Sequence, residues 1–142
     1  MKRLMLLPML ALVTACAAAG AGGALETRVI TEGGYAAGDF PQPQAMAARD
    51  QETLQRLWKD VGQGTPPPLG ENETVVFLFA GSRPTGGWSI QPPAAKIENG
   101  ILVIEAAVQG PPAGAMVTQA FTSPYLVLTV NTRTFDDLLW KR

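Results

Sequence analysis

The sequence contains no histidine, one cysteine and only three serines, at positions 82, 89 and 123. Histidine is the usual general base of serine and cysteine hydrolases and the commonest metal ligand, so its absence removes the most frequent forms of both sites. A serine–lysine pair would need a lysine such as Lys96, and nothing in the local sequence supports one. We therefore expect no catalytic residue, no metal and no cofactor, and predict that the protein is not an enzyme.

Charged side chains are also few and balanced, with 11 basic and 12 acidic residues and a net charge of −1. No basic patch is present, which argues against nucleic acid as a partner. Asp136 and Asp137 would point to opposite faces of a strand, and Glu71 with Glu73 is typical of the solvated start of a strand. Neither pair predicts an acid–base site or a calcium site.

The N-terminal residues have the features of an export signal. Lys2 and Arg3 precede an apolar run, 4–12, that is too short to span a membrane. The segment 12–16, Leu-Val-Thr-Ala-Cys, resembles the bacterial lipobox, in which the cysteine becomes the first mature residue and carries a diacylglycerol. The alternative, ordinary cleavage after Ala17, would remove Cys16 with the signal.

The lipobox predicts a signal peptide over residues 1–15 and a lipidated, palmitate-bearing Cys16. Two or more acyl chains give stable membrane anchoring, whereas one chain is marginal. An aspartate after the cysteine would retain such a lipoprotein at the inner membrane, but Ala17 stands at this position. We therefore expect the protein in a bacterial cell envelope, on the periplasmic face of the outer membrane. Small residues make 16–25 a flexible tether, and residues 26–142 form a single domain.

A single helix is predicted over Gln51–Val61, between an N-cap at Asp50 and a terminating Gly62. Apolar residues recur along one face of it, as a packing helix requires. The sequence predicts a loop over 33–44, a proline-rich connector over 62–70 and a hairpin turn at Asn99-Gly100. Strands are expected at Glu26–Thr31, Val75–Ala80, Trp88–Gln91, a segment ending near Ile97, Ile101–Gln109, Val117–Phe121, Tyr125–Asn131 and Phe135–Trp140.

These short strands with one helix predict a mainly β (α+β) fold. We expect a compact antiparallel sandwich or half-barrel of about six strands with one packed helix. The expected motif core spans about residues 72–131.

The chain is organised around the connection 81–88, Gly-Ser-Arg-Pro-Thr-Gly-Gly-Trp, which lies between two predicted strands. Proline fixes one φ angle, and Gly86-Gly87 permits positive φ and close backbone approach. Arginine and tryptophan are frequent binding hot spots. The connection is therefore either a loop that binds another protein or a rigid structural link.

Two separated motifs stand out in the sequence. The first is the apolar run 75–80 followed by the loop 81–88; the second is 111–125, Pro-Pro-Ala-Gly-Ala-Met-Val-Thr-Gln-Ala-Phe-Thr-Ser-Pro-Tyr. Together they resemble the PrcB family, named for a subunit of a cell-surface protease complex. Trp88 stands where the family usually has tyrosine. The resemblance, over about residues 45–131, implies accessory or regulatory binding to a protease.

The loop 84–88 is also faintly similar to a loop of chagasin-type cysteine protease inhibitors. The leading hypothesis is a non-catalytic, lipid-anchored module that binds an exported protease or another envelope protein. The alternatives are a structural envelope lipoprotein whose motifs only build the fold, and an inhibitor-like loop presenter. The expected partner-binding residues are Arg83, Pro84, Thr85, Gly86, Gly87, Trp88, Thr122, Ser123, Pro124 and Tyr125.

Overall fold

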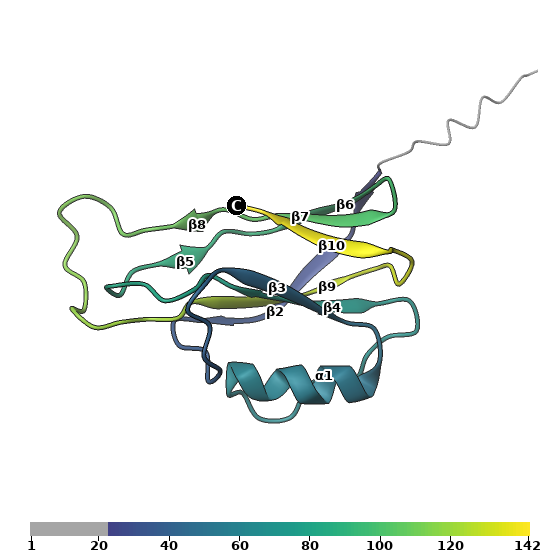
Figure 1. Cartoon of the computed structure of the whole chain (residues 1–142), viewed down its shortest axis with the longest axis horizontal. Helices are drawn as coiled ribbons and strands as arrows, with labels where there is room; N and C mark the ends of the chain where they lie inside the picture. The colour runs from purple at the N-terminus through teal and green to yellow at the C-terminus, as the bar shows by residue number, and fades with distance from the viewer. Residues whose placement is uncertain (1–22) are drawn as a thin grey trace, which may run out of the picture.

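The computed structural model describes residues 23–142. The predicted signal peptide, Cys16 and most of the predicted tether lie outside the described residues. The described chain is mainly β, and its sheets form two layers. A helix packs against one of these layers (Figure 1). This confirms the predicted fold class.

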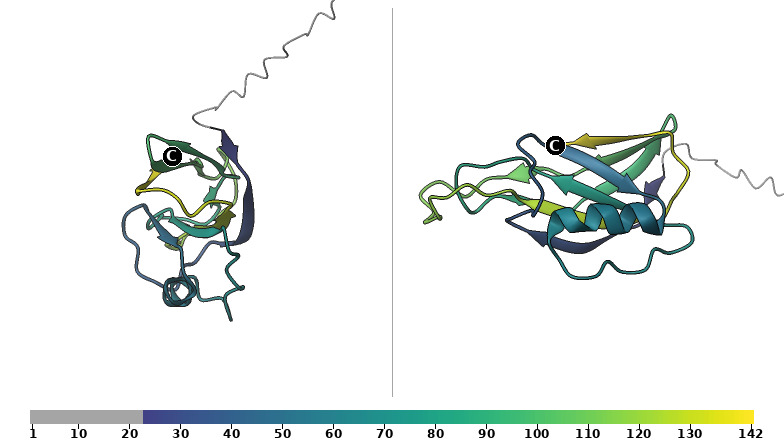
Figure 2. Two further views of the ribbon diagram at one scale, coloured as in Figure 1. Left: turned by 90° about the vertical axis from the view of Figure 1, so that its right-hand side faces the viewer. Right: turned by 60° about the horizontal axis from the view of Figure 1, so that its bottom comes forward.

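The central sheet lies between the helix and the other sheet (Figure 2). Its strand order is β2 (Thr27–Gly33), β9 (Tyr125–Val130), β4 (Thr74–Phe79) and β3 (Gln44–Ala48), and all neighbours are antiparallel. Every residue of β4 and β9 is buried. The unbroken apolar run therefore forms an inner strand that is covered on both faces, as its sequence predicts.

The outer sheet has the order β1 (Ala24–Leu25), β6 (Ala94–Glu98), β7 (Ile101–Glu105) and β10 (Asp137–Lys141). Asn99 and Gly100, with φ of 49° and 79°, make the predicted hairpin turn between β6 and β7. A two-stranded ribbon of β5 (Ser89–Ile90) and β8 (Val108–Gln109) extends beyond this sheet.

Two apolar clusters hold the layers together. Alternate residues of the inner strands, such as Val76 and Leu128, pack between the two sheets against Leu102 and Ile104. The intervening residues, such as Phe77, pack against the helix. One strand thus contributes to both clusters because successive side chains point to opposite faces.

The helix forms as predicted. Helix α1 (Gln51–Trp58) continues into a 3₁₀ turn, η1 (Lys59–Val61), which ends at Gly62. The backbone N–H of Thr53 donates to Asp50 Oδ1 at 2.8 Å, so Asp50 is the N-cap. Leu54, Trp58 and Val61 are buried against the central sheet.

Several sequence predictions of strands were wrong in detail. Residues 117–121 form no strand and belong to an exposed loop. The pairing of β7 with β10 is parallel, so the fold is not purely antiparallel. Strand β3 was not predicted, β1 begins within the expected tether, and the expected strand over 101–109 is divided into β7 and β8.

Candidate functional site

The loop 81–88 is bonded to the segment that precedes β9. Arg83 and Thr122 exchange two backbone hydrogen bonds, of 2.8 and 2.9 Å. The N–H of Gly86 donates to the carbonyl oxygen of Thr118 at 2.9 Å, and Thr122 Oγ1 donates to the carbonyl oxygen of Thr85 at 2.8 Å. The two sequence motifs, far apart in the chain, therefore form one unit.

Gly87 allows a close approach that no other residue would permit. Its φ is +82°, and a Cβ atom there would lie 2.9 Å from Pro111 Cβ and 3.0 Å from Val117 Cγ1. Both the left-handed backbone and the lack of space require glycine. Gly87 thus fixes how the loop 81–88 packs on the long loop after β8.

Arg83 and Trp88 contact each other instead of extending separately into solvent. The Arg83 guanidinium carbon lies 4.8 Å from the centroid of the Trp88 ring, a cation–π arrangement. Arg83 Nη2 donates to the carbonyl oxygen of Ala80 at 2.8 Å, and Trp88 Nε1 donates to Thr85 Oγ1 at 3.3 Å. Both side chains are half-buried, so they hold the loop in a fixed shape.

The second motif is anchored equally firmly. The N–H of Ser123 donates to the carbonyl oxygen of Gly34, and the carbonyl oxygen of Pro124 accepts from the N–H of Ala80, each at 2.8 Å. Tyr125 is 3% exposed, and its hydroxyl accepts a 2.9 Å hydrogen bond from Gln63 Nε2. Of the predicted binding residues in both motifs, only Pro84 and Gly87 are exposed.

The largest exposed apolar side chains near these motifs were not singled out in the sequence. Met116 is fully exposed, Phe121 is 76% exposed and Tyr35 is 64% exposed. Tyr35 forms a β-bridge with Ser123, which places it beside the end of the loop that contains Phe121. We call Tyr35, Met116 and Phe121 the apolar tip.

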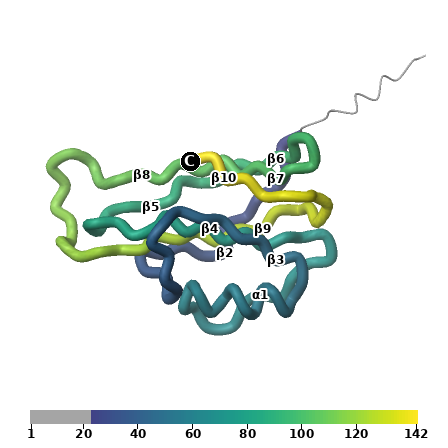
Figure 3. The backbone as a smooth tube through the Cα atoms, viewed as in Figure 1, coloured from purple at the N-terminus to yellow at the C-terminus, as the bar shows by residue number. Residues whose placement is uncertain are grey.

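The loop of Met116 and Phe121 projects at one end of the molecule, and the described chain begins beside β6 at the other (Figures 1 and 3). A sequence signal for the tip does exist. No charged residue occurs between Glu105 and Arg133, and this stretch includes exposed loop as well as buried strand. An uncharged exposed loop with large apolar side chains makes this end of the molecule a candidate contact surface.

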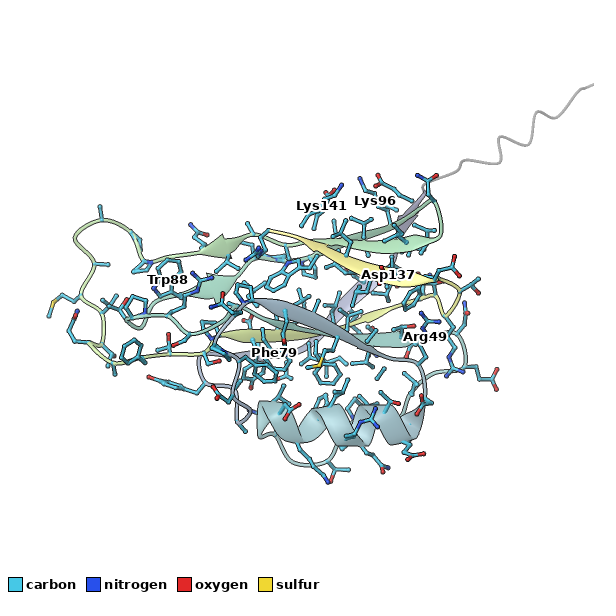
Figure 4. All side chains as sticks on the ribbon, in the orientation of Figure 1. Arg49, Phe79, Trp88, Lys96, Asp137 and Lys141 are labelled. Atoms are coloured by element: carbon cyan, nitrogen blue, oxygen red, sulfur yellow. The ribbon has the colours of Figure 1, made fainter. Side chains whose placement is uncertain are left out.

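A cleft of about 290 Å³ opens where the two motifs end. Trp88, which lies at the start of β5 in Figure 4, lines it together with Tyr125 at the start of β9. The remaining lining residues are Glu32, Gly33, Ser89 and Ile90. The cleft therefore has aromatic and aliphatic walls and one carboxylate.

The charged cluster of the outer sheet lies apart from the motifs (Figure 4). Lys96 Nζ is 3.0 Å from Glu98 Oε1 and 3.1 Å from Glu105 Oε1. The Lys96 ammonium donates hydrogen bonds to the Glu98 and Glu105 carboxylates, which raise the pKa of Lys96, and the bond to Glu98 lowers the pKa of Glu98. Within residues 23–142 no group of three potential ligands is placed to hold a metal ion, and no helix has the length and apolar character to cross a membrane.

These observations define a β-sandwich domain with one packed helix, whose Arg-Pro-Thr-Gly-Gly-Trp loop is bonded to the Thr-Ser-Pro-Tyr segment. Residues 74–131 match the family model described as PrcB C-terminal. The match begins at β4 and ends just after β9, so it contains both motifs. No curated protein and no solved structure matches the chain.

Proposed function

We propose that this protein is a non-catalytic, lipid-anchored module of the bacterial envelope that binds an exported protease as an accessory or regulatory subunit. The family suggests association with a protease complex. The observation that carries the proposal is the apolar tip, because it lies beside both family motifs and exposes large side chains, two of them on a loop with no charged residue.

The tip has the composition of a protein-binding surface. Aromatic residues and methionine are enriched at the buried centres of interfaces, where charged residues are depleted. The hydrogen bonds between the loops at 85 and 122 hold the supporting backbone in one conformation. A surface held in this way loses little conformational entropy when it docks.

The position of the tip agrees with an anchor at Cys16. The described chain starts at the end of the molecule opposite the tip (Figure 1). Lipidation would hold that starting end near the membrane and would leave the tip directed toward proteins in the periplasm. An outer-membrane location and a membrane contact made by the lipid are parts of the same proposal.

A binding role without catalysis is supported by the side chains present. The chain has no histidine, and Lys96 lies between two carboxylates that keep it protonated. A protonated lysine cannot act as the general base for a serine. The absence of histidine and the pairing of Lys96 therefore argue against histidine-based and serine–lysine hydrolysis.

A purely structural envelope lipoprotein is the second candidate, and one observation favours it. Most of the predicted binding residues, Arg83 and Trp88 among them, are engaged in bonds and contacts within the chain. Under this alternative the motifs only build the fold, and the exposed tip has no partner.

Affinity purification of the full chain from detergent-solubilised envelopes separates the two candidates. Phe121→Ser removes an exposed side chain, so the free energy of unfolding should change by less than about 0.5 kcal/mol. We expect it to lower the recovery of a co-purifying protease at least about fivefold. Leu139→Ser, at a 45% exposed position on β10, is the matched control and should retain the protease. Equal recovery of the protease with the wild type, Phe121→Ser and Leu139→Ser would overturn the proposal.

A further inference from the structure

The cleft between the motifs contains a carboxylate with no ion-pair partner in the described part of the chain. Glu32 pairs across the sheet with Leu126, which belongs to the cluster between the two sheets. Cross-strand partners lie on the same face, so Glu32 faces the outer sheet from the edge of the central one. None of the ion pairs found among residues 23–142 includes it.

The other lining residues of the cleft are mostly apolar. Trp88, Ile90 and Tyr125 line it together with Gly33 and one polar residue, Ser89. A volume of about 290 Å³ is at the lower limit for a small-molecule site and suits the insertion of one side chain. A long aliphatic stem ending in a cation matches such walls, because lysine and arginine bury their methylene groups while the charged end pairs with a carboxylate.

The backbone beside the cleft offers a second mode of contact. Strand β2 is the terminal strand of the central sheet, and β5 pairs only with β8, so each has an unpaired edge. Glu32 and Gly33 are the last residues of β2. Unpaired edges accept an extended chain by main-chain hydrogen bonding, with pockets for alternate side chains giving specificity.

We propose that the cleft receives a lysine or arginine side chain of an extended partner segment that adds to the edge of β2, with Glu32 as the counter-ion. This inference rests on the proposed function and deepens it by naming the chemistry of the partner segment. The contact uses different residues from the apolar tip, so the two can be tested separately.

The test uses the full lipidated chain in detergent micelles with 5-fluorotryptophan at its three tryptophan positions. The probe is the peptide acetyl-Val-Thr-Lys-Thr-Val-amide, titrated while ¹⁹F NMR is recorded. We expect the Trp88 resonance to shift and those of Trp58 and Trp140 to stay. A peptide with norleucine in place of lysine should bind at least about fivefold more weakly.

Glu32→Gln should lower the affinity for the lysine peptide about fivefold and remove its dependence on salt. Glu71→Gln is the matched control, since it makes the same change at an exposed residue outside the cleft and should bind normally. Equal binding of the lysine and norleucine peptides, or no effect of Glu32→Gln, would overturn the proposal.

A third outcome would also overturn it. If Glu32 serves only to keep the edge of β2 from pairing with other chains, Glu32→Gln will self-associate in light scattering and the titration will be unchanged. If the peptide titration fails but the protease is still recovered through the apolar tip, the cleft proposal alone is wrong. If the peptide binds in a Glu32-dependent way but no protease is recovered, the proposal that the partner is a protease is wrong.

Discussion

The Thr122 hydroxyl donates a 2.8 Å hydrogen bond to the carbonyl oxygen of Thr85, which lies 37 residues earlier in the chain. Thr122 is 6% exposed, so this bond is shielded from water. Trp88 follows Thr85, and Tyr125 follows Thr122, by three residues each. Both aromatic residues line the cleft. This side-chain bond therefore adds to the backbone hydrogen bonds that join the two family motifs, close to two walls of the cleft.

Thr122→Val should destabilise the protein without large repacking, because valine has nearly the same shape. The change removes the donor and leaves the Thr85 carbonyl oxygen without its partner. We expect the free energy of unfolding to fall by about 1–2 kcal/mol, measured by urea titration. Thr65→Val, at an exposed position in the proline-rich connector, should change it by less than about 0.5 kcal/mol. Similar effects of both substitutions would show that the bond contributes nothing.

Gly87→Ala and Gly114→Ala separate backbone strain from steric conflict. Both glycines have positive φ, +82° and +78°, but only at Gly87 would a Cβ atom meet neighbours within 4 Å. Each substitution should cost about 1 kcal/mol for the left-handed conformation. Gly87→Ala should cost about 1–3 kcal/mol more because Pro111 and Val117 must move. Equal thermal unfolding temperatures of the two variants would contradict the packing of the loop 81–88 on the loop after β8.

The sequence was most informative where one local rule determines the structure. The apolar run of β4, the Asn99-Gly100 turn and the Asp50 cap each follow from neighbouring residues, and all three were predicted correctly. The resemblance to the PrcB family was recognised from the loop 81–88 together with the segment 111–125, and the family-model match over 74–131 confirms that resemblance.

The features that were missed depend on distant partners. Gln44–Ala48 has the residues of a helix or loop and becomes β3 because β4 needs a neighbour on its open edge. The parallel direction of β10 depends on how the chain crosses back to β7, which no local pattern specifies. Residues 117–121 alternate like a strand, but no strand lies beside them, and Phe121 is left exposed in the apolar tip.

Helix capping by Asp50 gives the stability of the protein a defined dependence on pH. The hydrogen bond from the Thr53 N–H, and then that from the Thr53 hydroxyl, hold the pKa of Asp50 below its ordinary value. A lowered pKa in the folded state contributes stability above the unfolded value, near pH 4, and this is lost as the pH falls through the folded pKa. Asp50→Asn keeps a capping oxygen without a titrating charge.

Urea titrations of the wild type and Asp50→Asn at pH 7 and pH 3 test this dependence. The advantage of the wild type over Asp50→Asn should shrink at the lower pH. An advantage that stays constant or grows would contradict the role of the carboxylate charge.

Cys16→Ser tests the proposed anchor. The substitution removes the only thiol of the chain, so metabolic labelling with palmitate should disappear and the protein should move from the detergent phase to the aqueous phase in Triton X-114 partitioning. Ala19→Ser, three residues further on, should keep both properties. Undiminished labelling of Cys16→Ser would show that the lipobox interpretation is wrong.

Photo-crosslinking in living cells shows whether the apolar tip contacts an exported protease. A photoreactive phenylalanine analogue at position 121 is close in size to Phe121, and the same analogue at the exposed Gln55 of α1 is the control. We expect an adduct with one exported protease from position 121 and none from position 55. Adducts only within the chain itself, or the same adducts from both positions, would contradict it.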